Sequence, residues 1–131
     1  MTPFALLAGV CGLSRDEAAE LLGEGQGAVG DWLAGRGSAP LPVLSALSEL
    51  EARIERAADA MAAMIREAPA AAEIELGYAV DDAEARQLGW PCRSAQRAAL
   101  GRAIARAGRP VRLVPRGSTS ATAGAADAHE R

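Results

Sequence analysis

The side chains that usually carry catalytic chemistry are scarce in this chain of 131 residues. Its one histidine is His129, close to the C-terminal end, and all 14 of its basic residues are arginine. The cysteines, Cys11 and Cys92, form no C-x-x-C pair and have no histidine near them in the sequence. No serine or cysteine has a recognisable base beside it. The sequence therefore predicts no enzyme activity, no metal site and no bound cofactor.

Polar side chains and glycines that could bind rather than catalyse gather in the stretch 14–40. Two short helices are predicted there, at 15–22 and 26–34, joined by a glycine turn. Ser14, followed by Glu17 three residues later, is the pattern of a capping box at the start of the first helix. These elements together predict a helix-turn-helix.

The turn is expected at Gly23, because glycine adopts the left-handed conformation that ends a helix without a Cβ clash. Ala19, four residues earlier, is small enough to let the two helices cross closely. Four residues fall where the motif needs its small core: Ala18, Leu22, Val29 and Trp32. Trp32 is expected as a wedge between the two helices.

With its ending Trp32-Leu33-Ala34-Gly35-Arg36, the stretch resembles the phage-repressor helix-turn-helix family, which has Cro-like and repressor-like members. The resemblance implies that helix 26–34 is a recognition helix lying in the DNA major groove. It also implies that Arg15 and Arg36 contact phosphates. Four residues depart from the family's usual pattern: Glu24, Gly27, Gly30 and Leu33.

The candidate recognition helix offers few groups that read bases. Gln26 can bond bidentately to adenine, and Ala28 can touch a thymine methyl group. Gly27 and Gly30 either permit close approach to the DNA backbone or lie on an exposed face without a role. Asp31 can accept a hydrogen bond from cytosine, although an acid in the groove more often repels phosphate. The alternative for the glutamine and for the two flanking arginines is a solvated surface position.

Charge is unevenly distributed along the chain, whose formal net charge is −3. Residues 1–50 hold two arginines and six acids, a net charge of −4. Residues 86–116 hold eight arginines and no acid, a net charge of +8. The arginine-rich segment suggests contacts with RNA or with DNA flanks, but such charges more often form a solvated face that balances an acidic partner domain.

Two further helices frame the motif, at 3–10 and 41–67. The first is expected to bury Phe4, Leu6, Leu7 and Val10. The second has apolar residues in alternating steps of four and three: Val43, Leu47, Leu50, Ile54, Ala57, Met61 and Met64. Its first turns would complete the core of the helix-turn-helix. The rest either packs against the chain's own C-terminal segment or forms the seam of a dimer.

The C-terminal part predicts a small α+β unit. Its elements are strands at 73–78 and 110–115 and helices at 83–88 and 94–107. A lone two-stranded sheet is marginal, so it should pack on the long helix or on a second subunit. The order of elements is similar to that of anti-CRISPR-associated autorepressors and related prophage regulators. That resemblance implies a homodimeric repressor that binds an inverted repeat in double-stranded DNA.

The sequence thus predicts a mainly α protein with a small C-terminal α+β unit. The expected segments are a DNA-binding domain (1–50), a long helix and connector (51–72), a dimerisation unit (73–116) and a disordered tail (117–131). The predicted function is transcriptional regulation by a cytoplasmic homodimer, without a membrane segment. The alternative is a protein-interaction or antitoxin-like module with a degenerate helix-turn-helix. The glycines, the acidic first half and Asp31 favour that alternative.

Overall fold

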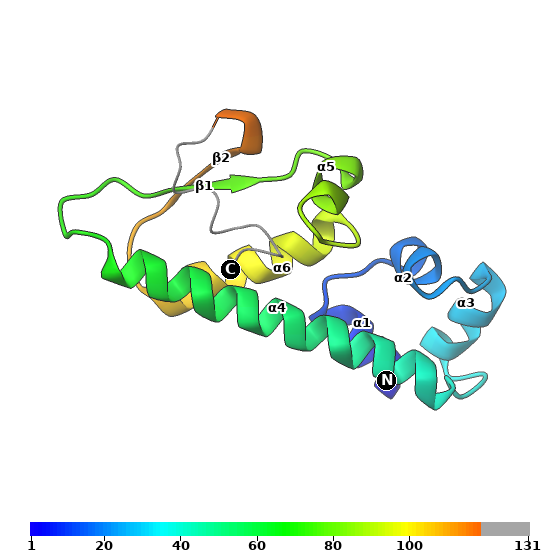
Figure 1. Cartoon of the computed structure of the whole chain (residues 1–131). Coiled ribbons are helices and arrows are strands. Elements are labelled where there is room, and N and C mark those ends of the chain that lie inside the picture. The colour runs from blue at the N-terminus through cyan, green and yellow to red at the C-terminus, as the bar shows by residue number, and fades with distance from the viewer. Residues whose placement is uncertain (119–131) are drawn as a thin grey trace. The chain divides into compact units, whose positions relative to one another are not determined.

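The computed structural model describes residues 1–118 and is mainly helical (Figure 1). Short N-terminal helices precede a long helix, and a small α+β unit with two short parallel strands follows. The chain divides into two compact units, Met1–Ala52 and a second that begins at Arg53. The predicted tail beyond Ser118, including His129, lies outside the described residues.

The first unit holds α1 (Pro3–Val10), α2 (Arg15–Leu22), α3 (Gln26–Ala34) and the start of α4 (Leu41–Glu67). All four helices have the bounds predicted from the sequence, because local signals mark their ends. Its core comprises Phe4, Ala8, Cys11, Leu13, Ala18, Ala19, Val29, Val43, Leu47 and Leu50. The first turns of α4 therefore complete this core, as expected.

The buried face of α1 differs from the prediction. Phe4 and Ala8, one turn apart, face the core, whereas Leu6 and Val10 are 53% and 45% exposed. Since each residue advances the helix by about 100°, Leu6 lies on the side opposite Phe4. The prediction that Leu6 and Val10 are buried was therefore wrong.

The second unit adds β1 (Glu75–Tyr78), α5 (Asp82–Gln87), α6 (Arg93–Ala107), β2 (Arg112–Pro115) and the 3₁₀ turn η1 (Arg116–Ser118). The strands pair in parallel, because α5 and α6 form the long crossover that parallel strands need. Both strands begin two residues later than predicted. The turn η1 packs against β1, so regular structure extends to Ser118, past the boundary at 117 where the disordered tail was predicted to begin.

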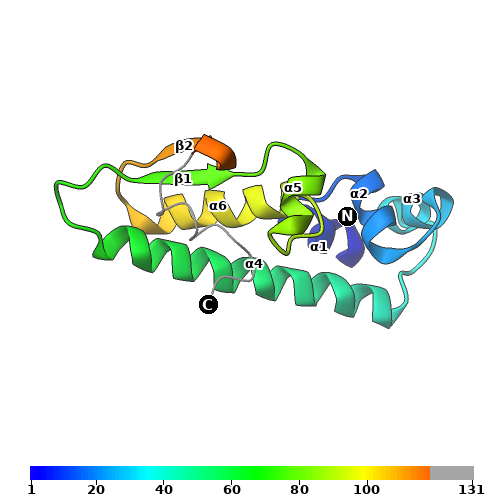
Figure 2. The same ribbon diagram turned by 45° about the horizontal axis from the view of Figure 1, so that its top comes forward.

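The second half of α4 is buried within its own chain, since α6 runs alongside it (Figures 1 and 2). Its buried residues are Ile54, Ala58, Met61, Ala62 and Ile65. Two expected stripe members depart from this set, because Ala57 is half-buried and Met64 is 47% exposed. A straight helix drifts by about 20° per heptad from a strict seven-residue repeat. The burial therefore follows that of an ordinary helix packed on its own C-terminal segment, and the dimer seam stays a prediction.

Candidate nucleic-acid interface

The start of α2 and the turn after it have the predicted geometry. The Ser14 hydroxyl accepts a hydrogen bond from the Glu17 N–H at 3.1 Å, and the Glu17 carboxylate accepts one from the Ser14 N–H at 2.9 Å. Gly23 adopts φ +66°, in the left-handed region. The N–H of Glu24 donates to the Ala19 carbonyl at 3.0 Å and closes the helix end. This turn fixes the direction in which α3 leaves α2.

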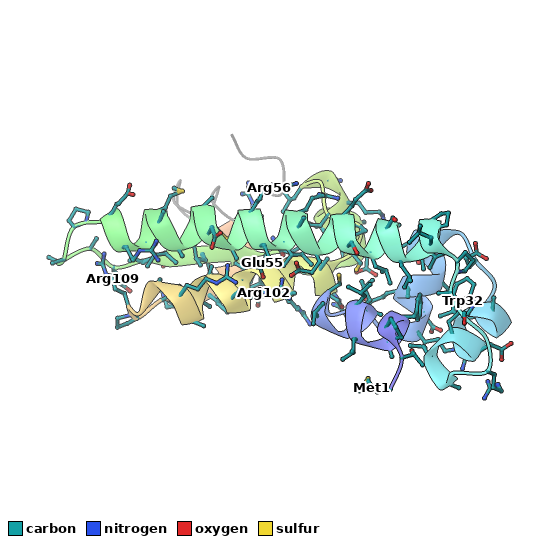
Figure 3. All side chains as sticks on the ribbon, turned by 90° about the horizontal axis from the view of Figure 1, so that it is seen from below. Met1, Trp32, Glu55, Arg56, Arg102 and Arg109 are labelled. Carbon is teal, nitrogen blue, oxygen red and sulfur yellow. The ribbon has the colours of Figure 1, made fainter. Side chains whose placement is uncertain are left out.

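Trp32 joins α3 to α1, a contact that the sequence did not indicate. Its ring meets the Phe4 ring edge-on, with centroids 5.4 Å apart. The Thr2 hydroxyl donates a hydrogen bond to the Trp32 carbonyl at 3.0 Å. Trp32 is half-buried, whereas Val29 is fully buried in the core of the motif. The aromatic pair thus anchors the last turn of α3 to the first helix (Trp32 is labelled in Figure 3).

Arg15 lies across α3 and explains one of the two glycines in that helix. Its Nη2 donates to the Gln26 carbonyl at 3.0 Å. A Cβ added at Gly30 would lie 2.7 Å from the same nitrogen. Gly30 is buried, so it neither lies on an exposed face nor offers a close approach to DNA. Its missing side chain makes room for the Arg15 guanidinium.

The exposed start of α3 contains Gln26 and Gly27. A Cβ added at Gly27 would meet no atom within 4 Å, so this glycine opens onto free space. The N-cap residue is Gly25, which supplies no side-chain hydrogen bond to the helix end. The first N–H groups of α3 therefore keep their capacity to bind an acceptor oxygen. Ala28, the candidate thymine contact, is only half-exposed.

Asp31 and Arg36 pair with each other at the far end of α3. The Arg36 Nε lies 2.9 Å from the Asp31 Oδ1, and the two side chains are 66% and 52% exposed. Such exposed pairs contribute about 0–1 kcal/mol to stability. Arg36 can therefore leave Asp31 for a phosphate oxygen at small cost. The pair also neutralises part of the acid's charge.

The acids of the first unit gather on the same two helices and their turn. Asp16, Glu20 and Glu24 are all exposed there. Arg15 is engaged with a carbonyl and Arg36 with a carboxylate. The structure thus places five of the predicted residues on the surface: Arg15, Gln26, Gly27, Asp31 and Arg36. It places Gly30 beneath Arg15.

The arginines of residues 86–116 bind mainly groups of their own unit. Arg106 contacts Glu55 at 2.6 Å and Asp59 at 2.8 Å. Arg102 contacts Glu55 at 3.2 Å, and these two residues are labelled in Figure 3. The hydrogen bond with Glu55 raises the pKa of Arg106 above its usual value. A sequence signal for this network existed. Glu55 with Asp59, and Arg102 with Arg106, are each four residues apart and so form matching helix faces.

Three more arginines of this segment donate hydrogen bonds to backbone carbonyls or form an ion pair between the strands. Arg109 donates to the carbonyls at the end of α4, at 2.6 Å to Ile65 and 2.7 Å to Ala68. Arg93 donates to the Val80 carbonyl at 3.0 Å, and Arg112 pairs with Glu75 across the strands. Within residues 1–118, only Arg86 and Arg97 of the eight have side chains without an ion pair or hydrogen bond to the protein. The segment is therefore mostly structural and presents no continuous basic surface.

No family model matches this sequence, and neither a curated protein nor a solved structure matches it. Across residues 1–118, no three histidine, cysteine, aspartate or glutamate side chains are grouped so that they could hold a metal ion. No helix in that same range is long and apolar enough to cross a membrane.

Proposed function

We propose that this protein is a sequence-specific DNA-binding transcriptional regulator whose α3 enters the major groove. The observation that carries the proposal is the α2–Gly23–α3 geometry. It presents the exposed Gln26 and Gly27 at the uncapped start of a helix. A helix start of this kind suits both a base edge and a neighbouring phosphate.

Each exposed residue then has a distinct role. Gln26 reads adenine through its side-chain amide, and Arg36 exchanges Asp31 for a phosphate. Arg15 donates one N–H to the Gln26 carbonyl, and its other N–H groups can donate to phosphate. Ala28 contributes at most an edge contact with a thymine methyl, because it is half-buried.

The regulator acts as a cytoplasmic homodimer on an inverted repeat and requires no cofactor. Two copies of α3 would read half-sites about 34 Å apart, one helical turn of DNA. By its resemblance to prophage regulators, the protein would repress a promoter of a prophage or another mobile element.

A second candidate is a protein-interaction module, such as an antitoxin-like subunit. The observation that favours it is electrostatic. Both arginines beside α3 are engaged within the protein, and three exposed acids lie on α2 and its turn. This surface would suit a basic protein partner better than a polyanion.

Selection of binding sites from random double-stranded DNA at low salt distinguishes the two candidates. Enrichment of a palindromic sequence is expected of the regulator. Fluorescence anisotropy on that sequence then tests the residues. Arg36→Ala should weaken binding to all sequences and reduce the salt slope by about one unit. Gln26→Ala should cost about 1–3 kcal/mol at one base position and relax the preference there.

Arg86→Gln is the matched control, since Arg86 is an exposed arginine of α5 without a side-chain partner in residues 1–118. It should leave the affinity unchanged. If no palindrome is enriched, the regulator is rejected and the interaction module takes its place.

A further inference from the structure

A pocket of about 360 Å³ lies in the second unit between α6 and the two strands. Its lining residues are Tyr78, Arg97, Leu100, Gly101, Ile104 and Leu113. Arg97 and Gly101 are four residues apart, as are Leu100 and Ile104, so the four residues from α6 share one helix face. No residue of α2 or α3 lines this pocket, and the proposed DNA-binding surface plays no part in it.

The pocket exists because α6 covers β1 more fully than β2. Leu76 of β1 and Leu113 of β2 are paired in register and therefore point to the same face of the sheet. Leu76 is 1% exposed, whereas Leu113 is 45% exposed. Tyr78, two residues after Leu76, points to this same face. An apolar wall of the sheet is thus left open beside α6.

Charge at this pocket has one sign. Arg97 is its only charged lining residue, and no acid is among the others. Arg97 is exposed and, within residues 1–118, its side chain makes no ion pair or hydrogen bond. The Tyr78 hydroxyl likewise has no partner in that range. An apolar cavity with one or two convergent polar groups is the usual form of a small-molecule site.

We propose that this pocket binds a small amphiphilic carboxylate. The apolar body would lie against Leu100, Ile104 and Leu113, and the carboxylate would pair with the Arg97 guanidinium. At roughly 30 Å³ per heavy atom, the volume a water molecule takes in the liquid, the pocket holds about a dozen such atoms. This size matches a short aryl or alkyl acid rather than a lipid.

A second copy of the chain is a poorer occupant on electrostatic grounds. A two-fold interface brings the same patch of both subunits together. Two Arg97 side chains would then approach each other, and the residues that line the two pockets supply no acid. Like charges that lose water in this way oppose association. A free carboxylate instead neutralises the charge.

Gly101 provides a precise means of testing the pocket. It lies in the interior of α6, and a Cβ added there would meet no atom within 4 Å. A leucine at this position would therefore extend into the pocket without moving the backbone. Since leucine also favours helix over glycine, Gly101→Leu should keep or raise the melting temperature.

The experiment is a ¹H–¹⁵N correlation NMR titration of the full chain with 4-phenylbutyrate. The uncharged isostere 4-phenylbutanamide is titrated in parallel. Saturable shifts are expected at the backbone N–H signals of Tyr78, Leu100, Gly101 and Leu113, and 4-phenylbutanamide should bind more weakly than 4-phenylbutyrate. Arg97→Gln should weaken binding of 4-phenylbutyrate about tenfold and leave binding of 4-phenylbutanamide unchanged. Gly101→Leu should abolish binding of both compounds.

Arg86→Gln serves as the charge-matched control and should bind like the native chain. The proposal is overturned if no saturable shift occurs, or if acid and amide bind equally well. It is also overturned if Gly101→Leu binds normally, because the ligand then lies elsewhere. Shifts of the same amides on dilution without ligand would show that a second copy covers the pocket, which likewise rejects the proposal.

Discussion

The neighbours Met64 and Ile65 on α4 provide a direct test of how this helix is packed. A dimer seam with alternating steps of four and three would bury Met64. The structure instead buries Ile65, which is 2% exposed, and leaves Met64 47% exposed. We therefore predict that Ile65→Ala destabilises the protein far more than Met64→Ala does.

The magnitudes follow from burial. Truncating a buried isoleucine to alanine costs about 2–5 kcal/mol, which includes the cavity left behind. Full burial of a methionine side chain contributes about 1.5–3 kcal/mol, so half-burial limits the Met64→Ala cost to about 1 kcal/mol. Alanine's higher helix propensity offsets part of that loss. The two variants should thus differ by about 1–4 kcal/mol in free energy of unfolding.

Urea unfolding followed by circular dichroism at 222 nm measures this difference. With m-values of about 1–3 kcal/mol/M, the midpoints of the two variants should lie about 1 M apart. The measurement is repeated at several protein concentrations. The reasoning fails if Met64→Ala is as costly as Ile65→Ala and both midpoints rise with concentration. Such a result would assign the outer face of α4 to a second copy.

Two further predictions concern α3 and the α4–α6 network. Gly27→Ala should raise the free energy of unfolding by up to about 1 kcal/mol, because the new methyl group meets no atom and alanine favours helix. Gly30→Ala should raise the free energy of unfolding less than Gly27→Ala does, because the new Cβ displaces the Arg15 guanidinium. Thermal unfolding measures both variants, and equal stabilisation would show that the contact between Arg15 and α3 is unimportant. Glu55→Gln should lower the melting temperature at low salt, because Arg102 and Arg106 both lose their ion pair with Glu55, and Arg106 keeps only the pair with Asp59. The difference from the native chain should shrink at about 1 M salt, where the Debye length is ~3 Å, and a salt-independent difference would contradict an electrostatic origin.

The helices could be predicted well because their ends are encoded locally. Ser14 with Glu17, Gly23 and Gly108 each act within one turn of the chain, so their effect is readable without tertiary structure. The faces of the helices could be predicted less well. Burial of Ala8 rather than Val10, or Ile65 rather than Met64, depends on which neighbour lies opposite. That information is not local.

The candidate site was predictable as a position in the chain but not as a set of contacts. The spacing of residues 14–36 located the helix pair and its turn. It did not reveal that Arg15 reaches across to the Gln26 carbonyl and covers Gly30, because the contact joins residues 11 positions apart on two helices. The Asp31–Arg36 pair lies within one turn of α3's end and was accessible to sequence reasoning. A long side chain's partner is otherwise set by the crossing angle of the helices.

The arginine-rich segment shows why net charge alone misleads about partners. Residues 86–116 carry +8, yet their side chains pair with Glu55 and Asp59 of α4 and with Glu75 of β1. Arg109 also donates hydrogen bonds to the carbonyls at the end of α4. Arg106 is held by two carboxylates at once and must leave both before it can bind phosphate, whereas Arg36 leaves a single exposed partner. If the protein is the proposed regulator, its contacts with DNA should therefore depend mainly on Arg15 and Arg36 beside α3 rather than on this segment. Affinity for DNA without the correct sequence should consequently be weak, and base contacts such as that of Gln26 would account for an unusually large share of the binding free energy.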